Sequence, residues 1–123
     1  RRSSTLISKT TGGINVVKVY TSQFRYARPD RLDITAKQKT PFSPTWSMVN
    51  RFKNGTINQE EYSYLYADLM NRSYITNYNS WCNILNLNKV TFVCYCNPNS
   101  FCHRFLLAQY FEILGAEYCG EIK

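Results

Sequence analysis

The chain has 123 residues, of which 44% are hydrophobic and 15% aromatic, and its 15 Lys and Arg against 8 Asp and Glu give a formal net charge of +7. A chain of this length and composition buries about two-thirds of its unfolded surface, which excludes disorder and predicts a globular domain. The longest mostly apolar stretch, residues 90–96, is far short of the ~20 residues of a membrane span, so no membrane association is expected.

The first half of the chain predicts two strands. Residues 1–13 are polar and end in Gly12-Gly13, which predicts a flexible N-terminal segment ahead of a single α/β domain over residues 14–123. The β-branched residues of 14–20 predict a strand at the centre of the sheet, and 32–35 predict a second strand.

Helical periodicity begins after the second strand. Ser43 is the expected cap of a short helix that ends at Asn54-Gly55. Asn58 predicts the start of a second helix, with acidic residues in its first turn and Arg72 in its last. A third helix is expected over residues 78–87.

The C-terminal part predicts a strand, a helix and a strand. Residues 89–96 are almost continuously apolar, which is typical of an interior strand. Ser100 or Asn99 caps the expected helix over residues 101–114, and 116–120 form the last strand. Such a unit favours a parallel pair. The predicted fold class is therefore α/β, a small three-layer sandwich with a mostly parallel, Rossmann-like sheet.

The loop between that strand and helix is the expected binding site. Open α/β sheets bind ligands at this edge, and the free amides of a helix start attract anions. Asn99, Ser100, Cys102 and His103 stand at the helix start, and Arg104 adds a guanidinium fork. The leading hypothesis is non-catalytic binding of a phosphate-bearing small molecule, either a nucleotide or a nucleotide-derived signal.

A second group of residues is expected to reach the same ligand. If the first strand lies beside the 89–96 strand, the loop after it opens on the same edge. Arg25 and Arg28 then flank the ligand, and Phe24 and Tyr26 stack on a flat base.

Two alternatives at this loop stay open. Cys102 beside His103 has the electropositive setting of a reactive thiol, which indicates an enzyme acting on a nucleotide or another anionic substrate. The phosphatase spacing of Cys, five residues and Arg is not met. In the other alternative, Arg104 only pairs with an acid such as Glu112 or Glu117.

The cysteines do not predict a metal or any other cofactor. Cys94, Cys96, Cys102 and His103 lie within ten positions, but their spacing differs from the usual Cys-x-x-Cys motif, and one partner is expected too deep in the sheet. Five cysteines in a chain of this size favour free thiols in a reducing cytoplasm.

The basic charge leaves a third class open, a nucleic-acid-binding accessory domain, although no helix carries a dense basic stripe. A homo-oligomer is compatible with the sequence. The Asn- and Tyr-rich composition is compatible with a phage or mobile-element protein that sequesters a host nucleotide signal.

Several segments together resemble the family of domains of unknown function numbered 488. The resemblance covers the chain from Val16 onward, and it implies a compact α/β domain with Cys102, His103 and Arg104 as motif positions. Members of that family often carry an acidic residue after the strand, where this chain has Asn97-Pro-Asn. The segments that carry the resemblance are Ser43-Pro-Thr-Trp-Ser-Met-Val, Asn54-Gly-Thr-Ile-Asn-Gln-Glu-Glu-Tyr, Val90-Thr-Phe-Val-Cys-Tyr-Cys, Phe101-Cys-His-Arg and Gly120-Glu-Ile.

Overall fold

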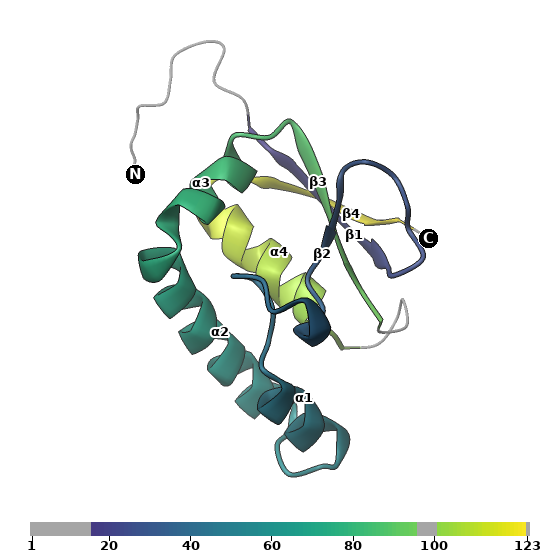
Figure 1. Cartoon of the computed structure of the whole chain (residues 1–123), viewed down its shortest axis with the longest axis vertical. Coiled ribbons are helices and arrows are strands. Elements are labelled where there is room, and N and C mark those ends of the chain that lie inside the picture. The colour runs from purple at the N-terminus through teal and green to yellow at the C-terminus, as the bar shows by residue number, and fades with distance from the viewer. Residues whose placement is uncertain (1–15, 96–100, 123) are drawn as a thin grey trace.

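A computed structural model describes residues 16–95 and 101–122 of the chain (Figure 1). The predicted flexible segment 1–13 lies outside this range. In chain order the elements are β1 (Lys18–Gln23), β2 (Arg31–Asp33), the 3-10 helix η1 (Ala36–Gln38), α1 (Trp46–Lys53), α2 (Gln59–Thr76), α3 (Tyr78–Leu85), β3 (Lys89–Cys94), α4 (His103–Ile113) and β4 (Glu117–Ile122).

The four strands form one parallel sheet in the order β2-β3-β1-β4, which confirms the predicted fold class and the central place of the first strand. β1 and β3 run side by side from the Lys18 and Lys89 pair to the Gln23 and Cys94 pair. Their carboxyl ends therefore meet at one edge of the sheet. β3 and β4 are parallel as expected, but β1 lies between them.

The helices lie to one side of the sheet, with α4 against the strands and α2 beyond α4 (Figure 1). The opposite face of β3 is covered by the connection between β1 and β2. There, the Thr91 hydroxyl donates to Asp30 over 2.5 Å and the Tyr26 hydroxyl donates to the same carboxylate over 2.7 Å. These contacts bury Thr91 completely. The sequence predicted burial of this strand on both faces, and a loop supplies the second cover.

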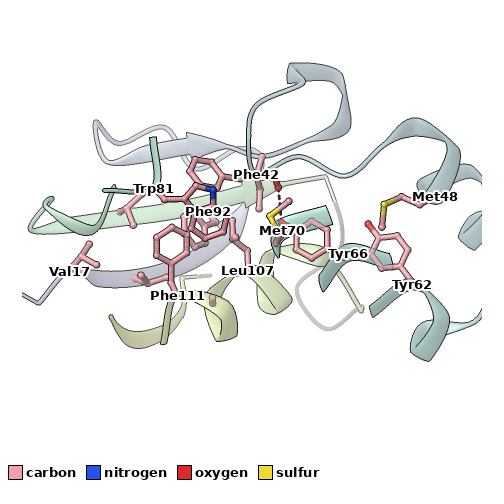
Figure 2. Packing of buried hydrophobic residues seen from close by; sticks show 14 of the residues in the cluster. Val17, Phe42, Met48, Tyr62, Tyr66, Met70, Trp81, Phe92, Leu107 and Phe111 are labelled. Atoms are coloured by element: carbon pink, nitrogen blue, oxygen red, sulfur yellow. Dashed lines mark hydrogen bonds between the residues drawn. The ribbon is translucent and has the colours of Figure 1, made fainter. Parts of the chain in front are cut away.

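An aromatic core fills the space between the sheet and the helices (Figure 2). Trp81 stacks on Phe111 with ring centres 4.9 Å apart, and Phe92 contacts Phe111 from the sheet at 5.4 Å. Further along, the buried Tyr66 hydroxyl donates to the Phe42 carbonyl over 2.7 Å. Burial of these rings joins α2, α3, α4 and the sheet into one unit.

Helix starts follow local capping chemistry. The predicted cap of α2 is confirmed: Asn58 accepts from the Glu61 amide, and the Glu61 carboxylate accepts from the Asn58 amide. The predicted cap of α1 is wrong. Thr45 occupies that place, because Ser43 instead donates its hydroxyl to the Thr35 carbonyl over 2.8 Å. None of the helices in the described ranges combines the length and apolar character needed to cross a membrane.

Candidate functional site

The carboxyl end of β3 and the start of α4 bring three side chains together. Cys94 is the last residue of β3, and Cys102 is the N-cap of α4, with an extended backbone at φ −154° and ψ 149°. Cys102 therefore precedes the helix, which begins at His103, two residues later than the predicted start at residue 101. His103 is the first helical residue. All three are buried, with His103 only 6% exposed.

The hydrogen bonds of His103 fix its protonation. Its Nε2 lies 2.7 Å from the Ile34 carbonyl oxygen, and because a carbonyl only accepts, Nε2 carries the hydrogen. Burial, helped by the nearby Arg104 charge, lowers the pKa of His103 from 6.5 to about 4. The ring is therefore neutral at pH 7, and its unprotonated Nδ1 faces the Cys102 Sγ at 3.7 Å. In the reduced form of the protein, the Cys102 thiol can donate toward Nδ1.

The sulfur of Cys102 also lies against that of Cys94. The structure records a disulfide between Cys94 and Cys102, while Cys82 and Cys119 are free thiols. The Cα atoms of the pair are 8.0 Å apart, whereas a relaxed disulfide holds them about 4.4–6.8 Å apart. The backbone spacing therefore suits two separate thiol groups better than a covalent bridge. Together with His103 Nδ1, the two Sγ atoms form a cluster with all atoms within 4.8 Å of one another, as metal ligands would require.

Arg104 is turned away from solvent and is fully buried. Its Nε and Nη2 donate to the two carboxylate oxygens of Glu121 on β4 over 3.2 and 3.0 Å, and Nη1 donates to the Cys94 Sγ over 3.0 Å. The guanidinium thus links α4 to β3 and β4. Pairing with an acid was one of the sequence alternatives, although the partner is Glu121 instead of Glu112 or Glu117. Such a guanidinium holds the site together and offers no exposed fork to a phosphate.

A pocket of about 210 Å³ opens above Cys94, Cys102 and His103. Its walls are mostly apolar and aromatic, which is typical of small-molecule sites. Two exposed lysines, Lys37 after β2 and Lys53 at the end of α1, belong to the lining. The remaining lining residues are Thr35, Ala36, Trp46, Val49, Phe52, Tyr62, Tyr95 and Phe101.

The other predicted binding residues lie outside this pocket. The loop after β1 does open on the expected edge, and its Phe24 stacks on the pocket residue Tyr95 with ring centres 4.1 Å apart. Tyr26 instead points to Asp30 on the opposite face of the sheet. Arg25 and Arg28 are exposed and are not among the described residues that line the pocket. The expected contacts of Asn99 and Ser100 lie outside the described residues.

Sequence reasoning missed the residues that complete the site. Cys94 was considered with Cys102 and His103 as a metal ligand and set aside as too deep in the sheet, but the three side chains lie together. The Ile34 carbonyl is a backbone group, so no residue type in the sequence indicates its role. Lys37 could have been found from its position just after β2, because parallel strands end at a common edge.

A family model described as "Active DUF488-N3 subclade" matches residues 9–114. No curated protein and no solved structure matches the chain.

Proposed function

The chain belongs to the DUF488 family, and from this premise and the pocket geometry we propose that it is an enzyme whose Cys102 thiol acts as a nucleophile on an anionic small molecule. The observation that carries this proposal is the contact between Cys102 and His103 in the pocket lining, together with the hydrogen bond from His103 to the Ile34 carbonyl. Nucleophilic catalysis requires a nucleophile, a base and a group that orients the base, and Cys102, His103 and the Ile34 carbonyl can take these three roles.

The first step is proton transfer from the Cys102 Sγ to the His103 Nδ1. The Ile34 carbonyl keeps the hydrogen on Nε2, so Nδ1 is the nitrogen that accepts. The resulting thiolate sits at the N-cap of α4, where the positive end of the helix dipole stabilises negative charge. The thiolate then bonds to the electrophilic atom of the substrate, and the protonated imidazole returns the proton to the leaving group.

The pocket walls indicate the class of substrate. Trp46 is half exposed and Phe52 also belongs to the lining, so the pocket offers aromatic rings on which a flat ring can stack. Lys37 and Lys53 supply positive charge for a phosphate or carboxylate. A nucleotide has both parts, and it is the substrate we propose. In this proposal the lysines take the role that the sequence assigned to Arg104.

Two observations support an enzyme over a non-catalytic binding protein. Arg104, the expected anion ligand, is buried on Glu121, so the group that argued most for simple capture faces away from the pocket. The pocket floor instead carries a thiol and an imidazole in contact.

The test is the reactivity of Cys102 toward iodoacetamide in the reduced, chelator-treated full chain, followed by peptide mass spectrometry. Cys119 is the matched control because it is exposed and outside the pocket. We expect Cys102 to react faster than Cys119 at pH 7 and His103→Gln to slow that reaction by about tenfold or more, since general bases contribute about 10²–10⁴-fold. Millimolar adenosine or uridine monophosphate should protect Cys102 in the wild type and fail to protect it in a Lys37→Ala, Lys53→Ala double variant.

Turnover is followed by chromatography of the same nucleotides. Loss of product formation in Cys102→Ser, with Cys119→Ser unchanged, supports the assignment. A Cys102 that reacts more slowly than Cys119, or turnover that survives Cys102→Ser, refutes it.

A further inference from the structure

We propose that Cys94, Cys102 and His103 bind a single Zn²⁺ ion and that this ion reversibly blocks the thiol. The regulatory half of the inference rests on the proposed function, whereas the binding half stands by itself. Its basis is the convergence of two sulfurs and one ring nitrogen, all buried and within 4.8 Å of one another.

The distance between Cys102 and His103 suits one ion that binds both of them. Zinc bonds of about 2.3 Å to sulfur and about 2.0–2.1 Å to nitrogen place tetrahedral ligand atoms about 3.5–3.8 Å apart. The Cys102 Sγ and His103 Nδ1 are 3.7 Å apart. The Cα separation of 8.0 Å between Cys94 and Cys102 also fits, because an ion between the sulfurs adds length to the link.

The groups around the cluster already have the roles of outer-shell partners in a zinc site. A zinc-bound imidazole usually donates its other N–H to a carbonyl or carboxylate, and His103 donates Nε2–H to Ile34. Arg104 donates to the Cys94 sulfur over 3.0 Å, which stabilises a thiolate ligand. The guanidinium is itself held by Glu121, so its position is set before an ion arrives.

The pocket gives the ion a route in and keeps one position of the ion open. All three residues belong to its lining, and three protein ligands leave a fourth tetrahedral position. Zinc held there occupies the Cys102 sulfur and the His103 nitrogen at once. The nucleophile and its base are then both unavailable, so the metal-bound protein is inactive and a chelator restores it.

The experiment titrates the reduced full chain with Zn²⁺ in competition with a chromophoric chelator and repeats the titration with Co²⁺, whose thiolate bonds absorb in the near ultraviolet. We expect one equivalent per chain and a thiolate-to-cobalt band. Cys94→Ser, Cys102→Ser and His103→Ala should each weaken zinc binding by more than about tenfold, since loss of outer-shell partners alone costs about 10–100-fold. Cys82→Ser and Cys119→Ser are matched controls and should leave affinity unchanged.

The same samples are then alkylated with iodoacetamide. One equivalent of Zn²⁺ should protect Cys102, and excess chelator should restore its reactivity. No zinc binding, or binding that survives all three ligand variants, overturns this inference while leaving a reactive Cys102 intact. Zinc binding with a chelator-treated Cys102 that stays unreactive refutes the proposed enzyme and the block on it, and leaves a metal site.

Discussion

Acidification between pH 7 and pH 5 should destabilise the chain through one side chain. The imidazole of His103 is buried, and its pKa falls from 6.5 to about 4 mainly for that reason. Below pH 6.5 the imidazole therefore binds a proton in the unfolded chain but stays neutral in the folded chain until the pH nears 4. The free energy of unfolding decreases as the pH falls. Above pH 6.5 both states are neutral at this residue, and the contribution is constant.

The size of the effect follows from the two pKa values. With 1.36 kcal/mol for each pH unit between them, the loss of stability reaches about 2 kcal/mol at pH 5 and about 3 kcal/mol at pH 4. The sequence contains one histidine, so no other imidazole titrates in this window. The pKa of Asp30 is lowered, with hydrogen bonds from Thr91 and Tyr26 outweighing its burial, so that carboxylate loses its contribution only below the window.

The assay is urea unfolding of the reduced, chelator-treated chain at pH 7, 6 and 5. His103→Gln is the matched control, because its amide can still donate to the Ile34 carbonyl but does not titrate. We expect the slope with pH to vanish in that variant, and the imidazole signals of the wild type should show no titration above pH 5 by NMR. A wild-type free energy of unfolding that is flat to within about 0.5 kcal/mol from pH 7 to pH 5 contradicts the linkage argument, as does a His103→Gln variant with the same slope.

Three stability predictions follow from other contacts and are checked by urea unfolding at pH 7. Glu121→Gln should cost about 3 kcal/mol because it removes the carboxylate from a buried ion pair. Arg72→Ala removes one side of an exposed ion pair and should cost less than about 0.5 kcal/mol. Equal losses in the two variants would contradict this. Phe111→Ala should cost about 4 kcal/mol through its cavity, against less than about 0.5 kcal/mol for the exposed Ile113→Ala. Asn58→Ala should cost about 1 kcal/mol and Asn58→Ser much less, since serine also caps.

Most elements could be predicted from the sequence, because periodicity and capping are local properties. The bounds of an element could not be predicted where its polar side chains hydrogen-bond to residues far away in the sequence. The first strand was expected to end at Tyr20, but it continues to Gln23. Thr21 shares a 2.7 Å hydrogen bond with the Tyr118 hydroxyl, and Ser22 donates to the Ile122 carbonyl. These partners lie on β4, far along the chain, so the polar run was not assigned to the strand.

The structure brings two of the predicted residues, Cys102 and His103, into a pocket at the expected edge of the sheet, but the orientation of the side chains was not predictable. Local sequence places Arg104 at a helix start, where an exposed guanidinium and a buried one look alike. The partner that decides between them, Glu121, lies on a strand whose register depends on β1. The same holds for Cys94 at the end of β3, which lies beside Cys102 at the start of α4.

The orientation of the His103 ring depends on a short edge strand of the sheet. Ile34 follows β2, an edge strand of three residues that pairs with β3 alone. The Ile34 amide donates to the Val93 carbonyl over 3.2 Å. When this edge frays, the imidazole loses its acceptor and its tautomer is no longer fixed. If Cys102 acts as we propose, its reactivity depends on this local opening, and hydrogen exchange at the Ile34 amide measures how often the edge opens.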